Sequence, residues 1–301
     1  MTRALTWGVG PRVLRRVPDD WVERPYTRIK LEPCTEVIGA EVRGIDLAAP
    51  LDDELGAEVR RALLEWKVLF FRDQRLSSEQ QLAFASHFGA LEQHPFLEQG
   101  DTPEVVRFEK GDDRTNPYGV GNENGWHSDV SWRVEPAMGA VLRAVEVPEH
   151  GGDTLWADMA CAYDNLPHEI KGQIADLRAV HSFVQVFGYG MSAEQRAEAL
   201  ERYPRVEHPV VRTHPETGRK TLYVNAFFCE RIVGLDDDES EWLLDRLCLQ
   251  AMHPEWQVRL HWEPGTVAFW DNRSTQHYAS SDYFPQRRVM DRVSIMGDRP
   301  F

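Results

Sequence analysis

In the N-terminal third of the chain, the hydrophobic positions recur first with the two-residue period of a strand and then with the period of a helix. Loose alternation at 37–42 predicts a strand, and apolar residues at near-helical spacing after Asp52 predict a helix. A buried strand is predicted for 67–71. A capping-box pattern at 77–80 predicts a second helix that stops at Gly89. We expect these elements to form a strand-and-helix lid on one edge of the core.

Short apolar stretches between polar loops dominate from about residue 103 onward. Their length and their β-branched or aromatic content are typical of strands. They lie at 104–108, 140–145, 155–157, 222–225 and 266–270. The glycine pair before Asp153 predicts a turn that places Thr154 at the start of a strand.

Helix start signals interrupt these strands. Short helices are predicted to begin at Asp158 and Pro167, and a capping box starts another helix at Ser192. Asp236 opens a long amphipathic helix, which we expect to end before Pro254. Strands at irregular spacing, with helices at the ends and between them, predict an α+β protein.

We expect a core of two sheets in a cupin-like jelly roll, with flanking helices and a helical insertion at about 180–210. A doubly wound parallel sheet is disfavoured, because strands and helices do not alternate regularly and no glycine-rich phosphate loop follows a strand. Residues 1–28 are rich in Arg and Pro and are interpreted as an irregular arm on the surface or on a neighbouring subunit. Residues 29–301 are interpreted as a single domain.

The charge balance restricts the partners of this chain. Its 49 acidic and 34 basic side chains give a formal net charge of −15, which disfavours nucleic-acid backbones and anionic membrane surfaces. No stretch approaches the ~20 apolar residues of a membrane span. An anionic ligand therefore needs a local positive site.

The cysteines of the chain are too few and too scattered for a disulfide scaffold or a Cys-x-x-Cys zinc site. They are Cys34, Cys161, Cys229 and Cys248. The first thirty or so residues lack the apolar region of a signal peptide. We therefore expect a cytoplasmic protein with reduced thiols. Its assembly, as a monomer or as a homo-oligomer such as a dimer or tetramer, is left open.

Two polar runs far apart in the sequence carry the candidate chemistry. His127 and Asp129 share one face of an extended run, and His277 follows 277 − 127 = 150 residues later in a polar turn. A solvated loop also explains an isolated His-x-Asp pair. Two histidines and a carboxylate, however, form the ligand set of non-haem Fe(II) oxygenases, which leaves one face of the metal open. Arginines that would hold an acidic co-substrate follow at Arg287, Arg288 and Arg292.

The other histidines lack a comparable context, and we expect them to be structural or solvated. They are His87, His150, His168, His181, His208, His214, His253 and His261.

Several motifs in the right order resemble those of the taurine dioxygenase family of Fe(II)- and 2-oxoglutarate-dependent oxygenases. They are WHSDV at 126–130, GGDTLW at 151–156, VVRTHPETG at 210–218 and WDNRSTQHYASSDYFPQRRVMDR at 270–292. The resemblance extends from about residue 30 to Phe301 and implies a double-stranded β-helix. It implies that His127, Asp129 and His277 bind Fe(II), with 2-oxoglutarate and O2 as co-substrates.

The same resemblance implies that Arg288 and Thr154 bind the far carboxylate of 2-oxoglutarate. A planar guanidinium binds a carboxylate through two hydrogen bonds and does not titrate, so arginine suits this position better than lysine. Arg287 is interpreted as a surface or ion-pairing residue.

A small anionic organic substrate is also implied. His94 and Arg292 match family residues that bind the sulfonate of taurine, and Phe187 and Phe228 match residues that wall its pocket. Val130 ends the first motif and is taken as a further pocket residue. The taurine enzyme has a tyrosine and an asparagine near the amine of taurine, where this chain has Leu97 and Glu123.

Three hypotheses follow for the function. The first is an oxygenase that hydroxylates the carbon next to a sulfonate or a sulfate ester, so that the product collapses to an aldehyde and sulfite or sulfate. The second keeps this mechanism on a small carboxylate, such as an aryloxyalkanoate or an amino-acid derivative. The third is a catalytically silent or zinc-dependent jelly-roll protein. Leu97 favours an apolar tail over the amine of taurine.

Overall fold

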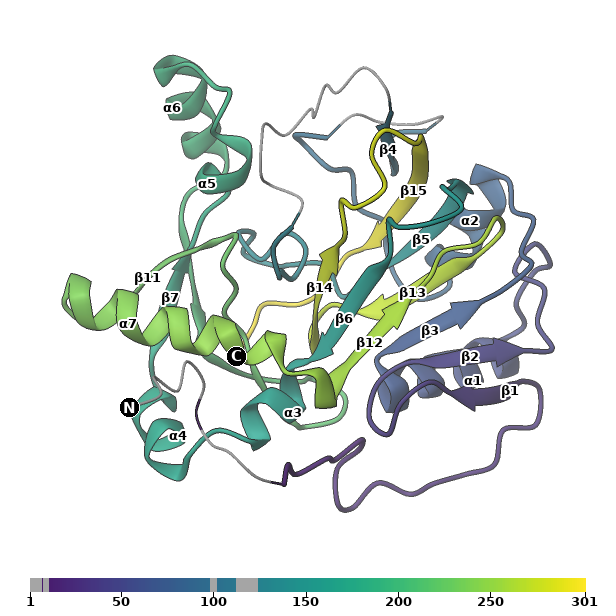
Figure 1. Cartoon of the computed structure of the whole chain (residues 1–301), viewed down its shortest axis with the longest axis horizontal. Helices are drawn as coiled ribbons and strands as arrows, with labels where there is room; N and C mark the ends of the chain where they lie inside the picture. Colours follow the sequence, from purple (N-terminus) through teal and green to yellow (C-terminus); the bar gives the residue numbers. More distant parts are fainter. Residues whose placement is uncertain (1–6, 8–10, 98–101, 112–123) are drawn as a thin grey trace.

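The computed structural model describes Trp7 and residues 11–97, 102–111 and 124–301. A large twisted sheet forms one layer of the core (Figure 1). Its strand order is β1 (Lys30–Pro33), β2 (Ala40–Arg43), β3 (Val68–Phe71), β13 (Val267–Asp271), β5 (Gly139–Glu146), β15 (Arg288–Ile295) and β4 (Val105–Lys110). β2 and β3 are parallel, whereas the other neighbours are antiparallel.

A smaller sheet packs against the large one. Its order is β12 (Gln257–Leu260), β6 (Thr154–Asp158) and β14 (Thr275–Ala279), and all its pairs are antiparallel. The ring of Trp156 in β6 lies 5.5 Å from Phe70 in β3 and 5.8 Å from Trp270 in β13, between centroids, so aromatic side chains fill the space between the layers. The predicted α+β jelly roll is confirmed.

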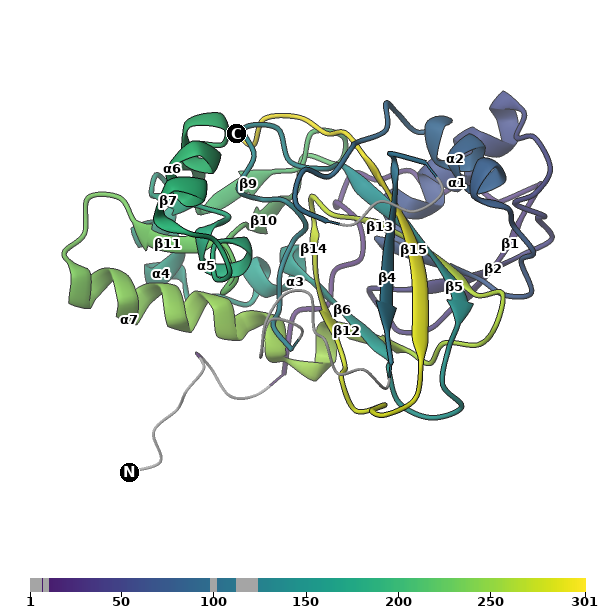
Figure 2. The ribbon, with the colours of Figure 1, turned by 90° about the horizontal axis from the view of Figure 1, so that it is seen from above.

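Helices cover the outer face of the large sheet and the side of the small one (Figure 2). α1 (Asp53–Trp66) and α2 (Ser78–Ser86) pack on the large sheet through a cluster that includes Leu63 and Phe84. The other side carries α3 (Met159–Asp164), α4 (His168–Ile174), α7 (Asp237–Cys248) and the 3-10 turns Leu249–Met252 and Pro254–Trp256.

The helical insertion predicted at about 180–210 is present, but strands flank it. It contains β7 (Arg178–His181), α5 (Val184–Phe187), α6 (Ala193–Arg202) and β8 (Val206–Pro209). β11 (Cys229–Ile232) pairs with β7, and β9 (Val211–Thr213) forms a hairpin with β10 (Lys220–Leu222). Figure 1 shows α5 and α6 projecting from the body of the molecule.

The local start signals are confirmed. Asp52 and Asp236 cap α1 and α7, and Ser77 and Ser192 form complete capping boxes at α2 and α6. Thr154 begins β6, as expected.

Several boundaries differ from the prediction. The strand predicted at 37–42 begins only at Ala40, because Gly39 adopts φ +84 and lies so close to Val258 that an added Cβ would stand 2.9 Å from its Cγ2. The strand predicted at 222–225 ends at Leu222, and α2 ends at Ser86. The predicted lid is instead part of the large sheet, because β3 pairs directly with β13.

Residues 11–28 pack against the surface of the same chain. The buried carboxylate of Glu65 in α1 accepts hydrogen bonds from Arg16, Trp21 and Tyr26, all of which belong to this segment. Asn165 exchanges hydrogen bonds with the backbone of Val13. The described part of the arm is thus fixed to the back of the fold by specific contacts. Among the described residues, no helix combines the length and apolar composition needed to cross a membrane.

Candidate active site

A backbone bridge brings the two candidate motifs together. His127 donates from its backbone N to the carbonyl of His277 at 3.1 Å, and His277 donates back to the carbonyl of His127 at 2.8 Å. β14 carries His277 and pairs with β6, where Trp156 stands opposite it. Residues 150 positions apart are therefore direct neighbours across an antiparallel pair.

Asn272 fixes the backbone around Asp129. Its side-chain oxygen accepts from the backbone N of Asp129 at 2.7 Å, and its amide group donates to the carbonyls of Asp129 at 2.9 Å and of Ala137 at 3.0 Å. Ser128 also donates to the carbonyl of Thr275 at 2.8 Å. The turn between β13 and β14 thus holds the loop that carries the first two candidate ligands. No local pattern in the sequence distinguishes Asn272 from its polar neighbours.

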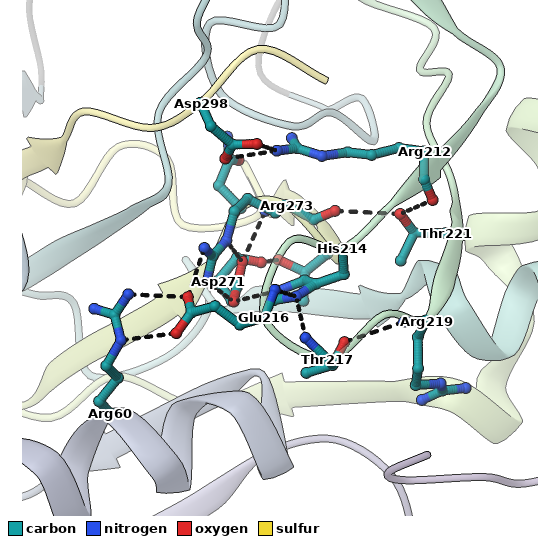
Figure 3. Close-up of polar contacts among 12 residues, drawn as sticks. Arg60, Arg212, His214, Glu216, Thr217, Arg219, Thr221, Asp271, Arg273 and Asp298 are labelled. Carbon is teal, nitrogen blue, oxygen red and sulfur yellow. Dashed lines mark hydrogen bonds and ion pairs between the residues drawn. The ribbon is translucent and has the colours of Figure 1, made fainter. Parts of the chain in front are cut away.

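A network of charges with a buried centre of Asp271, His214 and Arg273 lies behind this turn (Figure 3). Asp271 accepts two side-chain hydrogen bonds from Arg273 and one from His214 at 3.0 Å. Arg273 also reaches Glu216, which accepts two hydrogen bonds from Arg60 of α1. Burial alone would raise the pKa of Asp271, but Arg273 and His214 hold it well below its usual range. His214 is therefore structural, and the network connects α1 to the turn.

We expect Asn272→Ala to lower both stability and metal affinity. The substitution leaves the buried backbone N–H of Asp129 without its acceptor, which costs about 1 to 3 kcal/mol. It also frees the loop that orients Asp129, and the loss of such supporting contacts typically weakens metal binding by roughly 10- to 100-fold. Thermal unfolding and calorimetric titration with Mn(II) measure the two effects. Unchanged Mn(II) affinity would show that Asn272 supports only the fold.

His127, Asp129 and His277 have the geometry of a metal site. One ligand atom from each lies within 4.8 Å of the others. The Nε2 atoms of His127 and His277 lie 3.8 and 4.0 Å from Asp129 Oδ1. Asp129 Oδ2 is buried and has no hydrogen-bond partner among the described residues. A buried acceptor of this kind fits a metal cation, so the residues suit Fe(II).

The protonation states also fit metal binding. Burial, assisted by the neighbouring His127, lowers the pKa of His277 to about 3, and burial lowers the pKa of His127 too. Burial alone would raise the pKa of Asp129, but Arg292 and the two histidines lower it to about 2. His127 Nδ1 lies 2.9 Å from the carbonyl of Gly125, which assigns the proton to Nδ1 and leaves Nε2 as the ligand atom. At neutral pH the set is two neutral imidazoles and one carboxylate.

A pocket of about 150 Å³ contains these ligands. Most residues expected at the site line it: His94, Leu97, His127, Asp129, Val130, Thr154, Phe187, Phe228, His277, Arg288 and Arg292. Glu123 lies outside the described residues. Lining residues that the sequence analysis missed include Phe108, Lys110, Phe227 and Met290. Lys110 faces Arg288 in the register of β4 and β15, which a single sequence does not show.

Two arginines on one face of β15 give the pocket two positively charged ends, one at each arginine. Arg288 and Arg292 are four residues apart, which corresponds to about 13 Å along a strand. Thr154 lies at the pocket with Arg288; its hydroxyl oxygen accepts from the indole N–H of Trp262 at 3.0 Å, so its own hydrogen is available to an anion. Arg287 is exposed and forms ion pairs with Glu109 and Glu146, as predicted.

Arg292 also contacts a candidate metal ligand. Its Nη1 donates to Asp129 Oδ1 at 2.7 Å, and both side chains are buried. His94 lies in the same pocket, and burial together with Arg292 lowers its pKa to about 3, so it is neutral. The backbone N of Phe96 donates to His94 Nδ1 at 3.2 Å, which places the hydrogen of His94 on Nε2. His94 and Arg292 can therefore both donate hydrogen bonds to an anion.

Apolar side chains form the remaining walls. The rings of Phe187 and Phe228 lie nearly parallel, with centroids 6.3 Å apart. Val130 is buried and adopts φ +47, a strained conformation for a β-branched residue. A strained backbone conformation of this kind persists only where surrounding contacts maintain it. Here Val130 directly follows Asp129, whose backbone is fixed by Asn272. An organic group bound here would meet hydrocarbon rather than charge.

Comparison with known proteins identifies related sequences. The family model for taurine catabolism dioxygenase TauD, TfdA family, matches residues 30–294. An alkylsulfatase of Acinetobacter baylyi is 38% identical, with 92% of this chain and 88% of that protein covered. An alpha-ketoglutarate-dependent sulfate ester dioxygenase of Pseudomonas putida is 35% identical, with 90% and 91% covered. An (S)-phenoxypropionate/alpha-ketoglutarate-dioxygenase of Sphingobium herbicidovorans is 37% identical, with 89% and 95% covered.

Solved structures show the same fold. The structure of AAD-2 in complex with Mn(II) and N-oxalylglycine superposes with a TM-score of 0.78 at 31% sequence identity, and the match covers 91% of this chain and 99% of that one.

Proposed function

The chain belongs to the taurine catabolism dioxygenase TauD, TfdA family and is an Fe(II)- and 2-oxoglutarate-dependent dioxygenase, and on this premise we propose that its substrates are organic sulfate esters. Hydroxylation of the carbon next to the ester oxygen gives an unstable product, which collapses to an aldehyde and sulfate. 2-Oxoglutarate and O2 are consumed, and succinate and CO2 are formed.

One observation carries this proposal: the metal ligands share a pocket with two separate cationic ends on β15. An enzyme that binds an acidic co-substrate and an anionic substrate together needs two such ends. A spacing of about 13 Å between Arg288 and Arg292 keeps the two anions apart. The pocket thus provides a positive site for each anion in an otherwise acidic protein.

We assign the following roles to the residues. His127, Asp129 and His277 would hold Fe(II), which when bound supplies the redox chemistry that couples decarboxylation of 2-oxoglutarate to hydroxylation of the substrate. Arg288 binds the far carboxylate of 2-oxoglutarate, and Thr154 adds a hydroxyl donor.

His94 and Arg292 donate hydrogen bonds to the sulfate group of the substrate. Phe187, Phe228 and Val130 contact its organic group and exclude water from the reacting carbon. Leu97 lies in the same pocket and adds apolar surface.

Carboxylate substrates are the second candidate, and the likeness to the phenoxypropionate dioxygenase favours them. Arg292 would bind a carboxylate as readily as a sulfate, so the same pocket serves both. The third hypothesis, a silent or zinc-dependent jelly roll, is set aside by membership of the family.

We further propose a domain organisation, a type of partner and a cellular location for this enzyme. Residues 29–301 act as one catalytic domain, with 1–28 as an arm, and the partner is a small anionic molecule rather than a nucleic acid or a membrane. All four cysteines are free, which supports a reducing, cytoplasmic location.

We expect a medium-chain alkyl sulfate such as hexyl sulfate to exceed taurine in kcat/KM by roughly 5- to 30-fold. Burial of the extra hydrocarbon against Leu97, Phe187 and Phe228 contributes about 1 to 2 kcal/mol. Succinate release measured across alkyl sulfates, alkyl sulfonates, taurine and aryloxy acids provides the test. A higher kcat/KM for taurine would contradict the proposal, and a higher value for aryloxy acids would favour the second candidate.

Arg292→Ala is expected to remove the stimulation by alkyl sulfate. Because Arg292 also contacts Asp129, the variant needs a control for the metal site, namely its affinity for Mn(II). Arg292→Lys keeps the charge and should retain part of the stimulation. Wild-type kinetics for Arg292→Ala would overturn the assignment of this arginine to the substrate.

A further inference from the structure

The imidazole of His127 is enclosed by two phenyl rings. Phe227 stacks on it, with ring centroids 4.8 Å apart and an interplanar angle of 14°. Phe228 meets it edge-on at 6.2 Å and 80°, and the two phenyl rings are themselves nearly perpendicular, at 87°. The ring of Phe227 is thus the one that lies parallel to the imidazole, whereas the ring of His277, 4.2 Å away between centroids, is tilted by 49°.

Gly125 makes room for this stacking. A Cβ added to Gly125 would lie 1.8 Å from Cε1 of Phe227, which is far inside the contact distance of two carbon atoms. The carbonyl of the same glycine accepts the hydrogen bond from His127 Nδ1. Gly125 therefore contacts His127 at one edge and leaves the space in which Phe227 covers its face.

Asn225 fixes the segment that carries the two phenylalanines. Its side-chain oxygen accepts from the backbone N of Phe227 at 3.2 Å and of Phe228 at 3.0 Å. Its amide group donates to Ser131 Oγ at 3.0 Å. Ser131 follows closely on Asp129, so the segment is tied to the same loop that carries the metal ligands.

We propose that Gly125 and Phe227 are a positioning pair for the metal ligand His127. The carbonyl of Gly125 sets the tautomer, and the ring of Phe227 sets the plane, so that Nε2 points to the metal position. Phe187 lines the same pocket, where its ring packs against those of Phe228 and His94. The proposal rests on the assigned metal site, but its test needs no substrate.

Co(II) binding to the purified full-length protein tests the pair, with calorimetry for affinity and the visible Co(II) spectrum for ligand geometry. Phe227→Ala should lower the affinity roughly tenfold and change the spectrum. Phe227→Tyr keeps the stacked ring and should behave as wild type. Gly125→Ala displaces the ring and should reproduce the effect of Phe227→Ala. The double variant should be no worse than Phe227→Ala alone, because the added methyl group then has room.

Phe187→Ala is the matched control, since it removes another phenyl ring of the pocket, one that packs on Phe228 and His94. It should raise the KM for alkyl sulfate and leave Co(II) binding unchanged. Circular dichroism without metal shows whether Phe227→Ala folds. If it does not, Phe227→Leu removes the aromatic ring while keeping a side-chain volume closer to that of phenylalanine. It should also show the weakened binding and the altered spectrum.

Wild-type Co(II) affinity and spectrum in Phe227→Ala or Phe227→Leu would overturn the proposal. Additive losses in the double variant would equally contradict a shared mechanism. A wild-type protein that binds Co(II) but releases no succinate with alkyl sulfates would contradict the proposed substrate and not the positioning pair.

Discussion

His277→Ala, His127→Ala and Asp129→Ala are each expected to abolish succinate formation. Each removes one of the three groups that converge within 4.8 Å, and two remaining ligands hold Fe(II) too weakly and without a fixed open face. The loss should exceed the roughly 10- to 100-fold decrease in metal affinity that follows from changing only a supporting residue. Titration with Mn(II) and an assay of succinate release measure the two effects. Full turnover by any one variant would exclude that residue as a ligand.

The three variants should differ in stability. Asp129→Ala leaves the buried guanidinium of Arg292 without its partner, and breaking a buried pair in this way costs about 3 to 5 kcal/mol. The histidine variants remove neutral side chains and should lose less stability without metal than Asp129→Ala does. Thermal unfolding in the presence of a chelator separates the two cases. Asp129→Glu should lose most activity, because one methylene group displaces the ligand oxygen.

Arg288→Gln is expected to raise the 2-oxoglutarate concentration required for half-maximal activity by tens- to thousands-fold. A buried charge-assisted pair costs about 2 to 5 kcal/mol when one partner is removed. Arg288 is 9% exposed and lines the pocket near the metal ligands. Metal affinity should change little, because Arg288 does not belong to the ligand set.

The neighbouring arginine provides a matched control for this prediction. Arg287→Gln removes the same charge one residue away, but this side chain is exposed and pairs with Glu109 and Glu146 outside the pocket. Exposed pairs contribute at most about 1 kcal/mol, so kinetics with 2-oxoglutarate should be close to wild type. The reverse ranking of the two variants would reassign the co-substrate site to Arg287.

Local signals in the sequence were sufficient for many elements. Asp52, Ser77 and Ser192 act within one turn of their helices, so neighbouring residues reveal their role. The candidate ligands could be identified because iron requires histidine and carboxylate ligands, and His127, Asp129 and His277 stand in recognisable motifs. Strand boundaries were less predictable, since Gly39 adopts φ +84 and packs against Val258, which is far away in sequence.

The supporting residues of the site could not be found in this way. Asn272 binds the backbone of a residue 143 positions away, and nothing in its own neighbourhood indicates that contact. The pairing of Arg292 with Asp129 likewise depends on how β15 faces the loop. Phe227 stood beside a recognised pocket residue, but its stacking on His127 becomes visible only in three dimensions.

The backbone bridge between His127 and His277 determines when the metal site can exist during synthesis. A growing chain exposes His127 and Asp129 long before the ribosome reaches His277, and until then a metal ion would meet only two of its ligands. A metal ion can therefore meet all three ligands only after His277 has paired with His127. Once bound, it stabilises the fold by mass action, by a free energy that grows with the logarithm of its free concentration. Assembly of the complete metal site is accordingly a late step of folding, which follows the pairing of the two histidines.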